Sequence, residues 1–112
     1  MSEVMSAEPK EVVEASKSGK EIVLIDVRTP GEYESLRAGI PSKHMPLDAF
    51  DPEDIDHDPS EPIYFICRSG RRSYEAASQA VAHGFEQVFN VEGGILAWES
   101  EDHPVHSGPV SS

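Results

Sequence analysis

Apolar residues along this chain gather in short runs. Some of these runs have few polar interruptions, so both faces of the element that they form would be apolar. Two runs are rich in β-branched and aromatic side chains and predict strands buried on both faces. They are residues 22–27 and 63–66. Three shorter runs predict minor strands, of which the first two are expected at sheet edges. They are residues 3–5, 44–47 and 88–91.

Four other segments place apolar side chains on one side of a helix. They are residues 7–17, 30–37, 73–83 and 95–100. Local signals mark their ends: Ser6 is expected as the N-cap of the first helix, and Gly19 and Gly84 as the stops of the first and third. Thr29-Pro30-Gly31-Glu32 forms a capping box with Pro at the first helical position.

The same patterns predict which side chains face the core and which segments remain outside it. The expected core-facing residues of the helices are Tyr33, Leu36, Tyr74, Ala77, Val81 and Trp98. Residues 48–62 are rich in Pro and acidic residues, which predicts an exposed irregular connection that tolerates change. The last ten residues are expected to form a loose tail.

Alternation of strands and helices predicts an α/β domain with a mostly parallel sheet and helices on both faces, because crossover connections are right-handed. The chain of 112 residues is long enough for one modest core. We therefore expect one domain over residues 1–105 and a loose C-terminal tail over residues 106–112.

Composition narrows the classes of partner. Nine Lys and Arg against 21 Asp and Glu argue against nucleic acid as a ligand. The N-terminus lacks a signal-peptide pattern, no run is long enough to span a membrane, and the single cysteine excludes an internal disulfide, so we expect a cytoplasmic protein. The histidines show no spacing typical of metal ligands, and no metal is predicted.

The candidate chemistry lies directly after the strand at residues 63–66. This strand ends in Cys67, the only cysteine, and three of the five arginines follow within five residues. A strand that feeds a tight loop and then a helix places the sulfur where loop N–H groups and the helix N-terminus converge. Such surroundings lower the pKa of a thiol and favour the nucleophilic thiolate. The pattern predicts an anion-binding cradle with a nucleophile at its base.

The segment from Cys67 to Ser73 resembles the active-site loop of single-domain rhodanese-like sulfurtransferases, in which six residues run from the catalytic Cys to an Arg. Residues 24–33 and 91–98 resemble the same family. The resemblance implies a five-stranded sheet, a persulfide on Cys67, no separate cofactor, a small anionic sulfur donor such as thiosulfate, and a thiol or protein acceptor. The implied donor-binding residues are Arg68, Ser69, Gly70, Arg71, Arg72 and Ser73. One departure is residues 36–42, which lack the His of a Gly-His-Ile-Pro-Gly run that members often have.

Two other functions compete with sulfur transfer. A phosphatase or arsenate reductase-like enzyme also uses Cys and Arg around an oxyanion, but its pattern has five residues between them and a His before the Cys. Here Arg72 comes one residue too early, and Ile66 precedes the Cys. The second competitor is a sulfur carrier or regulatory module of the same fold without turnover. Asp26 and Arg28 fit either a structural ion pair at the sheet edge or a supporting role beside the cradle.

Overall fold

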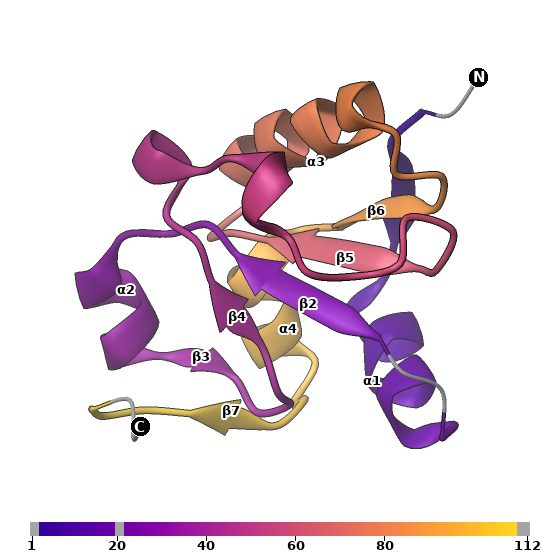
Figure 1. Ribbon diagram of the computed structural model, residues 1–112. Helices are drawn as coiled ribbons and strands as arrows, with labels where there is room; N and C mark the ends of the chain where they lie inside the picture. Colours follow the sequence, from indigo (N-terminus) through magenta and orange to yellow (C-terminus); the bar gives the residue numbers. More distant parts are fainter. Residues whose placement is uncertain (1–2, 20–21, 110–112) are drawn as a thin grey trace.

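The computed structural model describes residues 3–19 and 22–109, and its centre is a five-stranded parallel sheet (Figure 1). The strands lie in the order β1–β6–β5–β2–β4. Their bounds are Met5–Ala7 for β1, Val23–Asp26 for β2, Lys43–His44 for β4, Ile63–Ile66 for β5 and Val88–Val91 for β6. The predicted α/β class and five-stranded sheet are confirmed, and β5, which precedes Cys67, lies at the middle of the sheet.

Helices cover both faces of this sheet. Helix α3 packs on one face, and α1 and α4 pack on the other, while α2 lies beyond the end of β2 (Figure 1). The helices span Pro9–Lys17 for α1, Pro30–Ser35 for α2, Arg71–His83 for α3 and Gly94–Ser100 for α4. In the part of the chain that the structure describes, no helix has the length and apolar character needed to cross a membrane.

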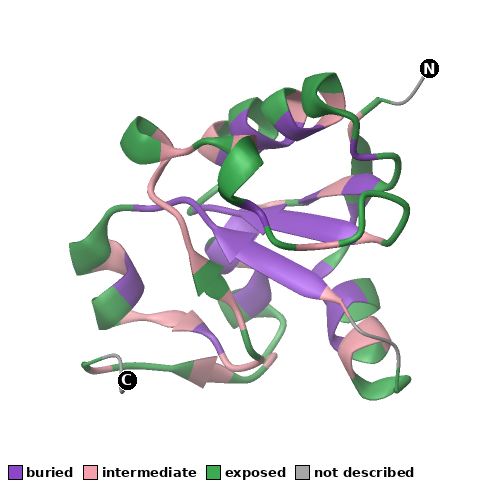
Figure 2. Cartoon of the chain, in the orientation of Figure 1, coloured by how far each residue is buried: buried purple, intermediate pink, exposed green. Residues whose placement is uncertain are grey.

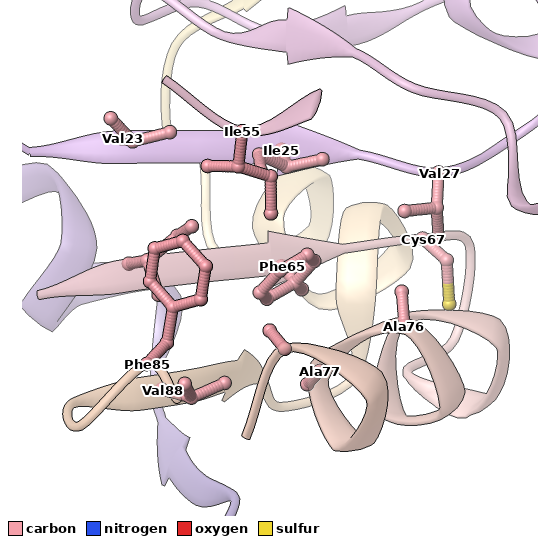
Figure 3. Packing of buried hydrophobic residues seen from close by; sticks show 12 residues of the cluster. Val23, Ile25, Val27, Ile55, Phe65, Cys67, Ala76, Ala77, Phe85 and Val88 are labelled. Carbon is pink, nitrogen blue, oxygen red and sulfur yellow. The ribbon is translucent and has the colours of Figure 1, made fainter. Parts of the chain in front are cut away.

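The central strands send alternate side chains into two separate cores, so that β2 and β5 are buried along their whole length (Figure 2). On the α3 side, Phe65 lies close to the small side chains of Ala76 and Ala77 (Figure 3). On the other side, Trp98 is fully buried, and its Nε1–H donates a 2.7 Å hydrogen bond to the carbonyl of Pro104. The prediction that Trp98 is a core residue is confirmed.

Two helix starts differ from the prediction. Ser6 belongs to β1, and α1 begins at Pro9 after a capping box formed by Glu8 and Glu11. Helix α3 begins at Arg71, two residues earlier than expected, because Gly70 adopts a φ of 106° and turns the chain directly into the helix.

The buried face of α3 also differs from the expected one. Tyr74 is 55% exposed, and the residues that face the sheet are Ser73, Ala76, Ala77 and Ala80. Small side chains allow the helix to approach the sheet closely, so the buried stripe follows the alanines rather than the largest apolar residue.

Residues 48–62 are not a featureless connection. Two short 3-10 turns, Leu47–Ala49 and Pro52–Asp54, organise this segment. Ile55 is only 8% exposed and lies in the core beside Ile25 (Figure 3). Phe50 meets the ring of Phe65 edge-on at 5.8 Å. The segment is mostly exposed, as expected, but it contributes Ile55 to the core, which the sequence did not predict.

The described part of the C-terminal segment is likewise anchored. Strand β7, Val105–His106, pairs antiparallel with β3, Arg37–Ala38, a strand that the sequence did not predict. Gly108 donates its N–H to the carbonyl of Glu34, and its own carbonyl accepts a 2.9 Å bond from Arg37 Nη1. These contacts anchor the segment as far as Gly108, where a loose tail was expected, and residues 110–112 of the predicted tail lie outside the described residues.

Candidate active site

Cys67 lies one residue beyond β5, at the carboxyl edge of the sheet and between the ends of two neighbouring strands. The residue is only 1% exposed, and its side chain points towards α3 (Figure 3). The sequence explains this position. The apolar run of β5 has to be buried on both faces, and Cys67 follows directly after it, at the edge of the sheet.

The loop after Cys67 folds back over the sulfur. The N–H of Gly70 donates to Sγ at 3.0 Å, and the hydroxyl of the buried Ser73 lies 3.2 Å from Sγ. Gly70 can take this shape because its positive φ is one that residues with a Cβ rarely adopt. Three of the predicted donor-binding residues, Ser69, Gly70 and Ser73, thus surround the sulfur itself.

The surroundings of Cys67 act on its ionisation in opposite directions. Burial is the largest single effect and raises the pKa of the Cys67 thiol. Hydrogen bonds from the Ser73 side chain and from the backbone N–H groups of Ser73, Gly70 and Ser69 together lower it by more, so the pKa is below the usual value. Hydrogen bonds to the charged form stabilise that form. The cradle therefore favours the thiolate, which is the reactive state of a cysteine.

Asn90 on β6 completes the polar shell, and sequence reasoning did not identify it. Its Oδ1 lies 2.5 Å from the Ser73 hydroxyl oxygen, and its Nδ2–H donates to the carbonyl of Gly70 at 2.8 Å. The signal in the sequence was an amide side chain inside an otherwise apolar strand, which needs polar partners once it is buried.

Arg72 forms an ion pair with Glu32 of α2, so a carboxylate of the protein itself holds its guanidinium group. Its two terminal nitrogens lie 2.8 and 3.0 Å from the two carboxylate oxygens of Glu32. The Arg72 hydrogen bond, opposed by partial burial and supported by hydrogen bonds from Thr29, lowers the pKa of Glu32 to about 2. Sequence reasoning found Glu32 only as the capping residue of α2, a role that it also has.

Arg68 and Arg71 differ from Arg72 in being exposed. Within residues 3–19 and 22–109, no carboxylate lies at ion-pair distance from either guanidinium. Arg68 lines a hollow of about 370 Å³ together with Leu36, Ile95 and Leu96. These two arginines are therefore the positive charges of the loop after Cys67 that have no ion-pair partner in the described part of the chain, and the whole chain has a net charge of −12.

The start of α4 contacts the backbone at the beginning of the loop of residues 67–73. The N–H groups of Ile95 and Leu96 donate to the carbonyls of Cys67 and Arg68 at 2.8 and 3.2 Å. A Cβ at Gly94 would collide with those same two carbonyl oxygens, so this close approach requires glycine. The glycines at the start of α4 thus allow this helix to hold the backbone of the site.

Asp26 and Arg28 form a buried ion pair at the end of β2. Their carboxylate and guanidinium approach to 2.8 Å, and Arg28 also donates to the carbonyl of Leu36. The N–H of Arg28 donates to Asp26 Oδ1 as well. The bond to Leu36 ties the end of β2 to the end of α2. The pair braces the segment that presents Glu32, and its hydrogen bonds in the structure do not involve the loop of residues 67–73.

A larger hollow lies elsewhere. It measures about 1110 Å³, is bordered by Ile55, Asp58 and Glu61, and lies where β5 and β6 begin, at the opposite edge of the sheet from Cys67. No cysteine, serine or threonine lines it. In the described part of the chain, no three His, Cys, Asp or Glu side chains converge as metal ligands would. The chemistry of the Cys67 loop, rather than cavity size, identifies the candidate site.

Comparison with known proteins places these features in a family context. A model of the rhodanese-like domain family matches residues 8–101. The chain is similar to the Bacillus subtilis protein YtwF, with 38% identity over 104 residues that cover 91% of this chain and 94% of that protein. It is also similar to thiosulfate sulfurtransferase GlpE of Pseudoalteromonas translucida, with 34% identity over 87 residues, which are 72% of this chain and 76% of the other.

A solved structure shows the same arrangement of elements. The crystal structure of a rhodanese-like domain protein from Staphylococcus aureus superimposes with a TM-score of 0.75 at 26% identity, and the match covers 94% of this chain and 99% of that chain. The part of the chain that matches the family model contains the whole 67–73 loop, the ion-pair partner Glu32 and the amide of Asn90.

Proposed function

The chain belongs to the rhodanese-like domain family, whose named relatives include sulfurtransferases, and we propose on this premise that it transfers sulfane sulfur through a persulfide on Cys67. One observation carries the proposal: a single buried cysteine whose sulfur receives hydrogen bonds from the Gly70 N–H and the Ser73 hydroxyl. These donors favour a thiolate and, after transfer, surround the bound sulfur.

The proposed reaction needs no general base. The Cys67 thiolate attacks the outer sulfur of thiosulfate, a sulfur–sulfur bond forms on the enzyme, and the sulfur–sulfur bond of the donor breaks with its electron pair leaving on sulfite. The total charge is unchanged and no proton moves. In the second half, a thiolate acceptor attacks the outer sulfur and Cys67 leaves as thiolate. The protein supplies a lowered pKa, N–H donors and positive charge.

We assign donor recognition mainly to Arg68 and Arg71. Both guanidinium groups are exposed beside the loop, whereas Glu32 largely neutralises the charge of Arg72. An anion approaching Cys67 is therefore attracted chiefly by these two side chains. The name of the relative GlpE, a thiosulfate sulfurtransferase, supports thiosulfate as the donor class. The acceptor is a small thiol or a protein thiol.

No cofactor enters this scheme, since the transferred sulfur is carried on Cys67 itself. A reducing compartment such as the cytoplasm suits the proposal, because thiols stay reduced there and Cys67 remains available to attack the donor. The burial of Cys67 also bears on the phosphatase alternative. Because the residue is only 1% exposed, we expect its sulfur to be reached more easily by a terminal sulfur atom than by a tetrahedral phosphate.

A sulfur carrier without turnover has the same loop, so the distinguishing experiment is a steady-state assay. Thiosulfate and cyanide are supplied and thiocyanate is measured, with Cys67→Ser as the control. The proposal expects many turnovers per protein molecule for the natural sequence and none for the variant. At most one thiocyanate per molecule, released from sulfur already on the purified protein and not renewed by thiosulfate, would instead identify a carrier. Aryl phosphate hydrolysis that is lost in Cys67→Ser would support the phosphatase.

A further inference from the structure

We propose that Asn90 is a positioning residue for the nucleophile, and that it competes with the Cys67 sulfur for the single hydroxyl proton of Ser73. The inference rests on the proposed function in that Cys67 is taken as the nucleophile. It adds a residue from a different strand, β6, which controls the sulfur through Ser73 without touching it.

The competition follows from a count of donors and acceptors around Ser73. Its hydroxyl oxygen lies 2.5 Å from Asn90 Oδ1 and 3.2 Å from Cys67 Sγ. A serine hydroxyl has only one proton to donate. The proton can therefore point to the amide oxygen or to the sulfur, but not to both, and the shorter distance favours the amide.

The orientation of the Asn90 amide is set by a second contact. Its nitrogen lies 2.8 Å from the carbonyl oxygen of Gly70, which only accepts hydrogen bonds. If the amide were turned over, two oxygens would face each other at this contact. The nitrogen therefore faces Gly70, and the amide oxygen necessarily faces Ser73. Because Ser73 is fully buried and Asn90 is 9% exposed, water has little access to replace a missing partner.

The demand for the Ser73 proton changes during the reaction. With a protonated Cys67, the S–H can donate to the Ser73 oxygen while Ser73 donates to Asn90, so all three groups are satisfied. With a thiolate, the Ser73 proton turns to the sulfur, and the buried Asn90 oxygen loses its donor, which is costly. In the persulfide, the charge moves to the outer sulfur, and the Ser73 proton can return to Asn90. Only rotation of a hydroxyl is involved. Asn90 thus disfavours the bare thiolate relative to the persulfide.

The competition predicts that removing the Asn90 amide lowers, rather than raises, the pH at which Cys67 ionises. Replacing Asn90 by Leu, which has a similar size and no acceptor, leaves the Ser73 proton to the thiolate alone, and the ionisation midpoint of Cys67 should fall by about 0.5–1 pH unit. Ser73→Ala removes the donor and should raise the midpoint. In Ser73→Ala/Asn90→Leu, the second change should have no further effect, because its action passes through the missing hydroxyl.

A matched variant separates this role from simple support of the loop. Asn90→Leu and Asn90→Asp both lose the N–H that binds the Gly70 carbonyl. If Asn90 only held the loop, both variants would raise the midpoint. The proposal instead predicts opposite shifts, since the Asp carboxylate takes the Ser73 proton more strongly and repels the thiolate. The other charged groups around this corner are Arg72 and Glu32 and the pair formed by Asp26 and Arg28, and all variants retain them.

The measurement is the pH dependence of the rate at which iodoacetamide alkylates Cys67, with folding of each variant checked by circular dichroism. Because no sulfur donor is present, a failure of sulfur transfer does not affect this readout. If Asn90→Leu does not fold, Asn90→Ala carries the same prediction. A lowered midpoint in Asn90→Leu that disappears in the Ser73→Ala background supports the competition. A raised midpoint, or a shift of equal size without the hydroxyl, overturns it.

Discussion

Glu32 of α2 and Arg72 of α3, 40 residues apart in the sequence, form a two-point ion pair beside the mouth of the Cys67 cradle. Their side chains are 30% and 35% exposed, so the pair is within reach of solvent and of a ligand. It draws Arg72, the residue that closes the loop, towards a carboxylate of the protein itself. An anionic donor therefore has to compete with Glu32 for this guanidinium.

Removing the charge of Glu32 should improve the binding of a small anionic donor. Glu32→Gln retains the capping box, because Gln at this position can also accept the Thr29 N–H. With Arg72 released, the KM for thiosulfate should fall by roughly 3- to 10-fold, while kcat changes less. Steady-state kinetics at fixed ionic strength measures both. Glu34→Gln, an exposed neighbour on the same helix, is the control for net charge. An unchanged or higher KM in Glu32→Gln would show that Arg72 does not meet the donor.

The same ion pair predicts a pH dependence of stability. The pKa of Glu32 is lowered in the folded state from about 4.5 to about 2, first by Arg72. A lowered folded-state pKa means that the contribution is present above the unfolded value and is lost as the pH falls through the folded value. The free-energy difference between the natural protein and Glu32→Gln, below about 1 kcal/mol for a pair this exposed, should therefore shrink between about pH 4.5 and pH 2. Urea unfolding across this range measures it, and a difference that grows on acidification would contradict the assignment.

Arg68 and Arg71 should act on donor capture more than on the chemical step. Each change to Ala should raise the KM for thiosulfate by a few-fold and make the rate less sensitive to salt, because screening acts on the attraction that these charges supply. Lys10→Ala removes one positive charge from an exposed position of α1 and provides the comparison. Kinetics that match those of Lys10→Ala would show that Arg68 and Arg71 act only as ordinary surface charges.

Residues 48–62 should prove necessary for stability rather than expendable. Ile55 is 8% exposed in the α3-side core, and Ile55→Ala should reduce the free energy of unfolding by about 2–4 kcal/mol through lost contacts and a cavity. Glu53→Ala changes an exposed side chain two residues away and should have little effect. Equal unfolding midpoints in urea for the two variants would mean that the side chain of Ile55 does not stabilise the core.

The parts of the fold that could be predicted are those with strong local signals. The runs that became β2, β5 and β6 are rich in apolar side chains, with Asp26 and Asn90 as single polar positions, and the capping box of Thr29 and Glu32 marks the start of α2. The pairing of β3 with β7 could not be predicted, because two-residue strands carry almost no pattern of their own. Their hydrogen bonds depend on where α4 ends and the chain returns.

The candidate site shows the same division. Cys67 and its loop are contiguous in the sequence, so their convergence could be predicted from a strand, a turn and a helix. Glu32 and Asn90 reach the loop from α2 and β6, and their roles depend on tertiary placement. The ion pair explains why counting three arginines overstated the charge available to a donor. Asn90 was overlooked because one polar residue in a strand often marks an edge rather than a buried network.

Intact mass spectrometry of the protein after incubation with thiosulfate and removal of the excess tests the central claim most directly. The account predicts a gain of one sulfur atom per chain, located on Cys67, reversed by cyanide and absent in Cys67→Ala. A protein that gains no sulfur from thiosulfate or from any other sulfane donor, while its Cys67 remains alkylatable, would contradict a persulfide on this residue.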